Sequence, residues 1–342
     1  MMPLAGTTIV EAYATGCNPA LRLAGAMAGH ILSGLGAQVI VLLVDDDLLH
    51  GRDADPALRA FLESGKTLRH AENTGIFPLP EGADGLITDE KLHVRLLPDV
   101  PDRTIILSFF GGMSDAAPGS EFTVLALSGV LDLIGDPARE PLKLGGHQAA
   151  YSAGISAATA MLAALCTDEK VRTIVSMLDT MVWINWKSPV GSQINGSAPS
   201  RQGSQSEWQV LRCADGYAAL VYQESDWRGL CDFIGDDRLR ELRFATAGER
   251  QHNARELAAI VERKLLTSNR EEIREQALAR RLPLGAVWSP RELVADRQYV
   301  ERDVFVRVPQ AGPSGARVPG LPVQWDGERL GEHVSATLPE AV

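Results

Sequence analysis

Strand-like and helix-like segments alternate along the first part of the chain. The segments TTIVEAY (7–13) and AQVIVLLV (37–44) are rich in β-branched residues, and the second is an almost unbroken apolar run. Such a run is typical of a strand buried on both faces of a parallel sheet. Between the two, residues 20–36 are small and apolar and end on glycines, which predicts a helix that stops there. This order predicts a β-α-β unit.

The same alternation continues for about another hundred residues. ADGLIT (83–88) and RTIILSFFG (103–111) predict two more strands, and VRTIVSMLDTMVWINW (171–186) predicts a strand followed by a helix. Residues 149–165 are almost all small or aliphatic, which favours a helix packed closely against its neighbours. Together these segments predict an α/β architecture with a doubly wound parallel sheet.

The pattern changes in the second half of the chain. GSQINGSAPSRQGSQSE (191–207) is rich in Gly, Ser, Gln and Asn and predicts a linker or mobile loop. WQVLRCADGYAALVY (208–222) predicts a hairpin that turns on Asp215 and Gly216, because an Asp-Gly pair favours a tight primed turn. Two charge-patterned segments, 254–266 and 270–281, predict amphipathic surface helices.

Composition excludes several classes of partner. The net charge of −11 makes a nucleic-acid backbone an unexpected partner. The N-terminus has no signal-peptide pattern and no apolar run is long enough to cross a membrane, so we expect a cytoplasmic protein without a membrane partner. The four cysteines are far apart in the sequence, which argues against a metal site and against disulfides.

Two nucleotide-binding motifs are excluded by their context. ESGKT (63–67) resembles the end of a phosphate-binding loop, but Ala60 stands where that loop needs glycine, and the preceding residues are helix-like. The glycines at 25, 29, 34 and 36 do not form a dinucleotide fingerprint, so close helix packing explains them better.

His147, within PLKLGGHQAAYSAG (141–154), is the candidate for acid–base chemistry. A lone histidine before a helix is more often a cap than a catalytic group, and no orienting acid or nucleophile is close to it in sequence. Ser152 is not in a nucleophile elbow, so a hydrolase is not indicated.

Read in order, these segments resemble family III CoA-transferases, the CaiB/BaiF family. The resemblance rests on LSGLGAQVIVLLV, FLESGKT, ADGLI, SEFTVLALSGVLDLIGDPAREPLKLGG, VRTIVSMLDTMV, RQGS and WQVLRCADGYAALV, and extends through LRFATAGERQHN and RRLPLGAVWSPRELVADRQYVERDVF to about residue 306.

The resemblance implies a large doubly wound, Rossmann-like α/β domain with a smaller inserted α+β domain. The implied boundaries are 1–190 for the large domain, 191–204 for a linker and glycine/serine-rich loop, 205–282 for the small domain, and 283–342 for a segment that returns to the large domain. Family members form interlocked dimers, which implies a homodimer or a heterodimer with a paralogous subunit.

The family reaction moves CoA from an acyl-CoA thioester to a small carboxylic acid through a mixed anhydride on an aspartate. It uses CoA or acyl-CoA as substrate and implies no covalently bound cofactor and no metal. The family aspartate stands four residues before the glycine that corresponds to Gly154, and this position is Ala150. The histidine of the related acyl-CoA racemases falls on Ser120, before Glu121.

Other family positions are partly kept. Lys66 matches the lysine after FLESG, and Arg201 and Gly203 match the R-x-G of a loop that covers the intermediate, so the resemblance implies CoA contacts at these three residues. The lysine of the second strand is replaced by Val41.

Three hypotheses stay open on the sequence. In the first, the chain is a CoA-transferase that works without the aspartyl anhydride, with His147 as a base, either alone or in a heteromer with an aspartate-bearing paralogue. In the second, it is a non-catalytic or regulatory acyl-CoA-binding subunit. In the third, it is an enzyme similar to acyl-CoA racemases and isomerases. Whether the chain is itself an enzyme is therefore undecided at this stage.

Overall fold

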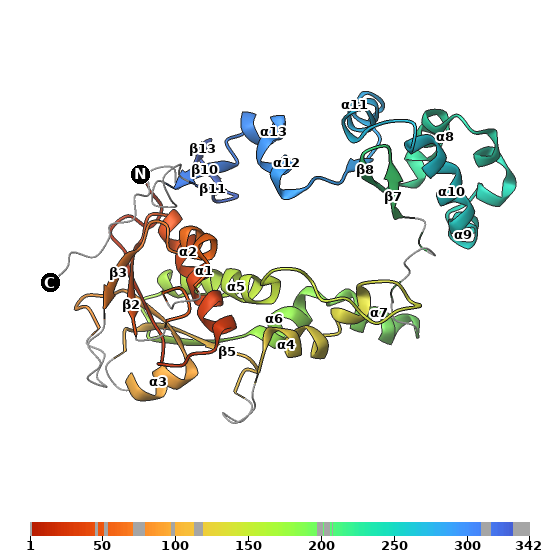
Figure 1. Ribbon diagram of the computed structural model, residues 1–342. Coiled ribbons are helices and arrows are strands. Elements are labelled where there is room, and N and C mark those ends of the chain that lie inside the picture. Colours follow the sequence, from red (N-terminus) through yellow and green to blue (C-terminus); the bar gives the residue numbers. More distant parts are fainter. Residues whose placement is uncertain are drawn as a thin grey trace. The chain divides into compact units, whose positions relative to one another are not determined.

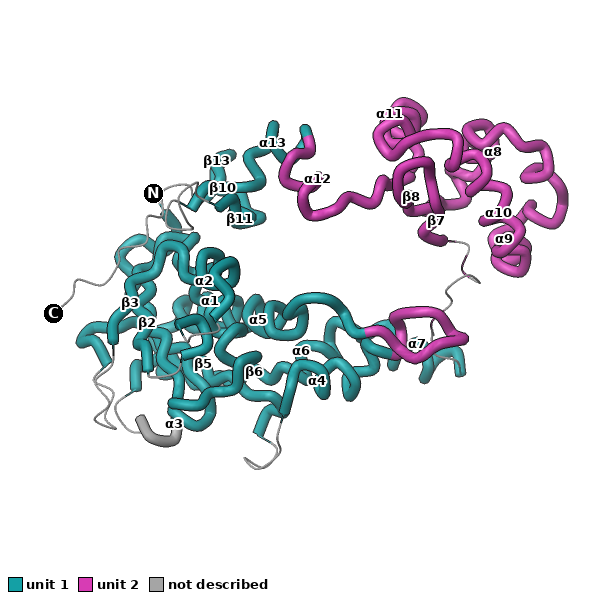
Figure 2. The backbone as a smooth tube through the Cα atoms, viewed as in Figure 1, with its two compact units in different colours: residues 1–131, 143–199, 297–342 teal, residues 132–142, 200–296 magenta. Residues whose placement is uncertain are grey.

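The computed structural model describes residues 2–44, 47–50, 54–70, 79–96, 100–112, 119–196, 201, 206, 208–308 and 316–330. The chain divides into two compact units, coloured separately in Figure 2. Unit 1 comprises residues 1–131, 143–199 and 297–342, and unit 2 comprises residues 132–142 and 200–296. The sequence predicted the return to the large domain at residue 283, whereas these units change over at 296/297.

Unit 1 is built on a six-stranded sheet with the order β3-β2-β1-β4-β5-β6 (Figure 1). All neighbouring strands are parallel. The order runs outward in both directions from β1 and β4, which is the doubly wound arrangement predicted from the sequence. The strands are β1 (Thr8–Ala12), β2 (Gln38–Leu43), β3 (Thr67–His70), β4 (Gly85–Asp89), β5 (Arg103–Ser108) and β6 (Val171–Ser176).

Helices cover both faces of this sheet. Successive strand residues point to opposite faces, so Ile9 joins the core beneath α1 (Pro19–Gly34) and α5 (Gln148–Leu165), while Val10 joins the core beneath α3 (Glu90–Leu96). The other helical elements of the N-terminal part are α2 (Pro56–Leu62), α4 (Glu121–Leu127), the 3₁₀ turn η1 (Leu131–Leu133), α6 (Met177–Ile184) and α7 (Lys187–Asn195).

Glycines let α1 and α5 approach closely, as their spacing predicted. A Cβ atom on Gly154 of α5 would lie 2.5 Å from the carbonyl oxygen of Ala24 in α1. On the other side of α1, a Cβ atom on Gly29 would lie 1.7 Å from Oε1 of Glu11. The glycines of α1 therefore serve packing and leave space for buried charged groups, and they do not form a nucleotide loop.

The ESGKT segment is not a phosphate-binding loop. Helix α2 precedes Lys66, and the edge strand β3 follows it. A phosphate-binding loop requires the opposite order, a strand before the loop and a helix after it. The sequence correctly excluded this motif but missed β3, whose half-exposed residues lack the continuous apolar run of the central strands.

Unit 2 contains an antiparallel three-stranded sheet with the order β7-β8-β9 and several helices, joined by its own apolar core. Its elements are β7 (Gln209–Cys213), β8 (Gly216–Leu220), η3 (Glu224–Asp226), α8 (Trp227–Ile234), η4 (Asp237–Arg240), η5 (Leu242–Phe244), α9 (Ala247–His252), α10 (Ala254–Leu265), α11 (Arg270–Arg280), β9 (Gly285–Ala286) and α12 (Pro290–Ala295). The two predicted amphipathic helices are confirmed as α10 and α11.

The hairpin of β7 and β8 turns one residue earlier than the sequence predicted. Cys213 pairs with Gly216, so the turn residues are Ala214 and Asp215, and neither Asp215 nor Gly216 has a positive φ angle. The primed Asp-Gly turn is therefore wrong. Tertiary contacts decide the turn, because Asp215 accepts a hydrogen bond from the backbone N–H of Arg270 at the start of α11.

The predicted linker begins as a helix. Helix α7 continues through Gly191 to Asn195 and ends at Gly196, which has the left-handed conformation that glycine favours. Pro189 lies in the first turn of α7, where a missing backbone N–H breaks no helical hydrogen bond. Gly and Pro content alone therefore misplaced the start of the irregular segment.

The C-terminal part of unit 1 adds small elements: α13 (Arg297–Glu301), β10 (Phe305–Val308), β11 (Ala316–Pro319), β12 (Gln324–Trp325) and β13 (Glu328–Arg329). Leu321 from this part lies where a Cβ atom on Gly34 of α1 would be, which ties the segment to the large unit. None of the helices among the described residues is both long and apolar enough to span a bilayer.

Candidate active site

The N-terminus of α5 is the part of unit 1 where the sequence placed its candidate chemistry. Gly146 has a positive φ angle of 73°, and His147 is the N-cap residue of α5, but its side chain makes no cap hydrogen bond. The first backbone N–H groups of a helix have no partner within the helix and need an acceptor from elsewhere. The sequence around His147 supplies none.

Glu121 supplies that acceptor from a different helix. Ser120 caps α4 by accepting a hydrogen bond from the backbone N–H of Thr123, and this fixes Glu121 as the first residue of α4. Oε1 of Glu121 accepts from the backbone N–H of Ala149 at 2.9 Å and of Ala150 at 3.3 Å. The positive end of the α5 dipole adds a favourable electrostatic term for this carboxylate.

His147 lies beside the second oxygen of the same carboxylate. Its Nδ1 atom is 3.2 Å from Oε2 of Glu121, and the two residues are 26 positions apart in sequence. The Glu121 side chain is only 9% exposed, whereas the His147 side chain is 40% exposed. The site therefore presents a buried carboxylate behind an accessible imidazole, and the histidine does have the acidic partner that its local sequence lacks.

One further side chain, Tyr151, borders this pair. The Tyr151 ring meets the His147 ring edge-on, with ring centroids 6.0 Å apart. Burial raises the pKa of the Tyr151 hydroxyl, and the nearby Glu121 and Asp55 carboxylates raise it further. The Lys143 ammonium lies 6.0 Å from the ring centre of Phe122, the neighbour of Glu121.

Ala150, which stands at the position of the family aspartate, has no exposed surface. Its methyl group belongs to the core between α1 and α5. Ser120, at the racemase histidine position, acts as the N-cap of α4. The residue that sequence reasoning missed here is Glu121. A signal for Glu121 was its position directly after a capping serine, but nothing in the sequence indicated that it reaches α5.

Lys66 is buried and contacts the backbone of α1. Its Nζ atom donates to Oε1 of Glu11 at 2.5 Å and to the carbonyl oxygen of Ala26 at 2.7 Å. Burial lowers the pKa of the Lys66 ammonium, while Glu11 acts in the opposite direction. The predicted contact of Lys66 with CoA would require this ammonium to leave Glu11.

Lys66 is part of a larger buried charge network. Arg22 pairs with Asp47 at 2.8 Å and with Glu11 and Glu63 at 3.5 Å each. His50 at the edge of the network lies 2.8 Å from Glu63. The charges satisfy one another, so this network has a structural role in positioning α1 on the sheet.

Arg201 belongs to unit 2 and is paired within it. Its NH1 group donates to the carboxylate of Asp132 at 3.0 Å and to the Asp132 carbonyl oxygen at 3.2 Å. Gly203, the other residue assigned to the covering loop, lies outside the described residues. The contacts of Arg201 and Gly203 with CoA stay predictions.

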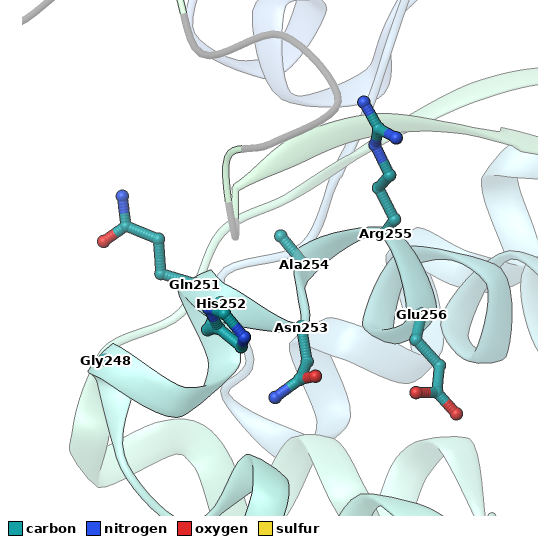
Figure 3. Close-up of a pocket in the computed structure, with 7 residues that line it drawn as sticks. All are labelled: Gly248, Gln251, His252, Asn253, Ala254, Arg255 and Glu256. Carbon is teal, nitrogen blue, oxygen red and sulfur yellow. The ribbon is translucent and has the colours of Figure 1, made fainter.

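A hollow of about 760 Å³ in unit 2 is not a second candidate site. Seven residues of α9 and the start of α10 line it (Figure 3). Figure 3 shows that Arg255 points away from Asn253 and Glu256, so the polar groups do not converge. Asn253 donates to two backbone carbonyl groups, and Glu256 is paired with Arg243.

The described part of the chain contains no group of three or more His, Cys, Asp or Glu side chains arranged to hold a metal ion. The four cysteines are free thiols in this structure, and Cys213 and Cys231 are buried.

The family model described as CoA-transferase family III matches residues 104–340. A succinate–glutarate CoA-transferase from Agrobacterium fabrum is 26% identical in sequence over an alignment that covers 99% of this chain and 95% of the relative. The match therefore spans both units.

Solved structures show the same fold. A CaiB/BaiF family protein from Brucella suis superposes with a TM-score of 0.80 at 23% identity, covering 98% of this chain and 96% of the other. A Mycobacterium tuberculosis protein superposes with a TM-score of 0.77 at 21% identity, covering 99% of this chain and 97% of the other. The resemblance drawn from ordered sequence segments is thereby confirmed at the level of the fold.

Proposed function

Because the chain belongs to CoA-transferase family III, we propose that it transfers CoA between an acyl-CoA thioester and a carboxylic acid. The observation that carries this proposal is the family match over residues 104–340, joined to a relative named for that reaction along nearly the whole chain. The acyl-CoA is a substrate in this reaction, and the exchange needs no resident cofactor.

The geometry around α5 supports an active chain. Replacement of the family aspartate by Ala150 left open a non-catalytic subunit. A carboxylate is nevertheless present within hydrogen-bonding distance of the Ala150 backbone, because Glu121 occupies that place. Thioester exchange with an acid requires charge stabilisation near the reacting carbonyl group, and the N-terminus of α5 offers it.

Short dicarboxylic acids are the first substrates to test. The Agrobacterium fabrum relative is named for succinate and glutarate. We propose Lys143 as the residue that holds the second carboxylate of such a substrate, because its ammonium lies 6.0 Å from the ring centre of Phe122, the residue after Glu121. A lysine of this kind would hold the distal carboxylate by charge.

The test is an exchange assay with the purified full-length chain. Succinyl-CoA is mixed with glutarate, acetate, oxalate or a branched acid, and the acyl-CoA products are separated and quantified. We expect a new acyl-CoA that depends on both enzyme and acid, with dicarboxylic acids preferred. If no acid in this panel accepts CoA, the proposal is wrong. Measured CoA binding without exchange would then indicate a binding subunit.

We further propose that the chain functions as a dimer of two copies. Large apolar side chains of α6, α7 and the residues between them are exposed to solvent in the single chain. They are Val182 (41%), Trp183 (77%), Ile184 (49%), Trp186 (59%) and Ile194 (76%). Several large apolar side chains exposed on successive helices favour an interaction surface here. Interlocked dimers are what the family resemblance implies.

Light scattering after size-exclusion chromatography tests this assembly. We expect the mass of a dimer for the wild-type chain and a monomer for the Trp183→Lys, Ile194→Lys double variant. The Leu242→Lys variant is the control, because Leu242 is 83% exposed and lies in unit 2, away from α6 and α7 in sequence. A monomeric wild-type chain that forms a stable complex only with a paralogue would replace the homodimer by a heterodimer.

A further inference from the structure

Five acidic side chains are buried in the described part of the chain: Glu11, Asp47, Glu63, Asp89 and Glu121. Glu11, Asp47 and Glu63 are held by Arg22, and Asp89 accepts hydrogen bonds from three backbone N–H groups through its two oxygens. Among these five, Glu121 combines one oxygen held by backbone amides with a second oxygen that faces a partly exposed histidine. Oε1 is held by backbone amides, while Oε2 faces the partly exposed His147.

Building on the proposed function, we propose that Glu121 is the covalent nucleophile of this chain. Its carboxylate accepts a hydrogen bond from the backbone of Ala150, the residue that lacks the nucleophilic side chain. An enzyme carboxylate divides the exchange between a thioester and an acid into steps with lower barriers. Glu121 would provide that carboxylate from α4, a helix other than the one that carries Ala150.

The first two steps transfer CoA from the donor acyl-CoA to Glu121. Oε2 of Glu121 attacks the carbonyl carbon of the donor thioester, the carbon–sulfur bond breaks, and CoA leaves as a thiolate. The product is a mixed anhydride between Glu121 and the donor acyl group. The thiolate then attacks the glutamyl carbonyl carbon, which releases the donor acid as a carboxylate and leaves CoA joined to Glu121 as a thioester.

The last two steps reverse this sequence with the acceptor. The acceptor carboxylate attacks the glutamyl thioester and expels the CoA thiolate, forming a second anhydride. The thiolate attacks the acceptor carbonyl carbon of that anhydride, giving the new acyl-CoA and the free Glu121 carboxylate. No oxidant, water molecule or net proton is consumed, and each bond that breaks is matched by one that forms.

The hydrogen bonds of Oε1 assist the steps in which the glutamyl carbonyl is attacked. In the anhydride and in the thioester, Oε1 is the carbonyl oxygen, and attack on the glutamyl carbon places negative charge on it. The N–H groups of Ala149 and Ala150 already donate to this atom at 2.9 and 3.3 Å. Preorganised backbone donors of this kind stabilise a developing oxyanion. The contacts that cap α5 therefore also form an oxyanion site.

His147 and the burial of Glu121 complete the arrangement. Nδ1 of His147 lies 3.2 Å from Oε2 and fixes the attacking oxygen, so His147 is a positioning residue for Glu121. The Glu121 side chain is 9% exposed, which limits access of water to an anhydride that water would hydrolyse. Ala150 contributes only a buried methyl group, so no second acid competes for this place.

The variant test separates nucleophile from helix cap. Glu121→Gln retains an oxygen that can accept from Ala149 and Ala150 but removes the nucleophile, and we expect exchange to fall by about 10³-fold or more with little loss of thermal stability. The control is Asp84→Asn, because the Asp84 carboxylate also accepts a backbone hydrogen bond, from Thr8 at 2.8 Å, but at the amino end of the sheet. We expect it to keep the wild-type rate.

An isotope experiment on the wild-type chain gives an independent answer. The acceptor acid carries heavy oxygen in its carboxylate, the enzyme is in excess, and a single turnover is followed by peptide mass spectrometry. The covalent route transfers heavy oxygen to the carboxyl group of Glu121, whereas direct attack by the acceptor on the donor thioester transfers it to the released donor acid. Label on the Glu121 peptide supports the proposal.

The outcomes distinguish this inference from the proposed function. Exchange with heavy oxygen in the donor acid and none on Glu121 overturns the covalent role but leaves CoA transfer intact. Label on another carboxylate, or an active Glu121→Gln variant, overturns it equally. Absence of any exchange overturns the proposed function and the role of Glu121 with it.

Discussion

The backbone N–H of Ala150 donates to the carboxylate of Glu121 over 3.3 Å, although the two residues are 29 positions apart and lie on different helices. A carboxylate thus lies directly at a position whose own side chain is a methyl group. This relationship makes replacement of Ala150 by an acid unfavourable, because a second carboxylate would be introduced next to the first one.

We therefore expect Ala150→Asp to destabilise the chain by about 3 kcal/mol or more, since it buries an unpaired charge beside a like charge. It should not increase CoA exchange while Glu121 is present. Denaturant unfolding measures the loss of stability, and Ala150→Asn is the matched control without the charge. The Ala150→Asp, Glu121→Gln double variant should be at least about 1 kcal/mol more stable than the sum of the two single effects on the free energy of unfolding predicts. If the two substitutions changed the free energy of unfolding in a strictly additive way, the carboxylates at positions 121 and 150 would not repel each other.

The close contact of α1 and α5 predicts a large difference between two helical glycines. Gly154→Ala places a Cβ atom 2.5 Å from the carbonyl oxygen of Ala24, so we expect a loss of about 1–3 kcal/mol in the free energy of unfolding. In Gly248→Ala of α9, the new Cβ atom meets nothing within 4 Å, and the better helix propensity of alanine should give up to about 1 kcal/mol of stability. Thermal and denaturant unfolding of the two variants decide this, and equal effects would refute the packing role of Gly154.

The Lys66–Glu11 pair predicts a strong stability effect for a residue that the sequence assigned to CoA. Lys66→Met leaves the buried Glu11 with only the longer contacts to Arg22 and to the Tyr13 hydroxyl, and we expect a loss of about 3–5 kcal/mol. The control is Lys170→Met, which breaks the exposed pair with Asp102 and should change stability by less than about 1 kcal/mol. A Lys66→Met variant that folds with wild-type stability but binds CoA weakly would instead favour the CoA role.

Acid should destabilise the chain through His30. Burial in α1 beside Phe61 lowers the pKa of His30 to about 4, and the nearby Lys66 ammonium lowers it as well. The unfolded chain, with an ordinary pKa near 6.5, takes up a proton over this range while the folded chain does not. Stability from this group is therefore complete above about pH 6.5 and is lost as the pH falls toward 4, by at most about 3 kcal/mol.

Unfolding free energies at a series of pH values between 4 and 7 measure this dependence. His30→Leu removes the titrating group and should flatten the curve in that window, whatever its effect on overall stability. An unchanged slope in the variant would show that other groups cause the acid sensitivity.

The sequence by itself determined the central strands, several helices and the fold class. Buried strands such as β2 and β5 are continuous apolar runs, and helices α5, α10 and α11 have clear periodic or small-residue patterns, so local physical preferences and tertiary packing agree. The glycines of α1 and Gly154 were correctly assigned to packing, because a Cβ atom at these positions would clash with neighbouring elements. The order of these segments also indicated the family.

Only the tertiary structure decided how the charged residues are used. Lys66, which the resemblance assigned to CoA, pairs with Glu11 of β1, and its contact with CoA stays a prediction. The predicted Asp-Gly turn was overridden by the contact of Asp215 with Arg270. His147 seemed to lack an acid because sequence reasoning sees only neighbours along the chain. The carboxylate of Glu121 reaches it from α4, and such long-range pairing depends on how helices pack, which no local pattern encodes.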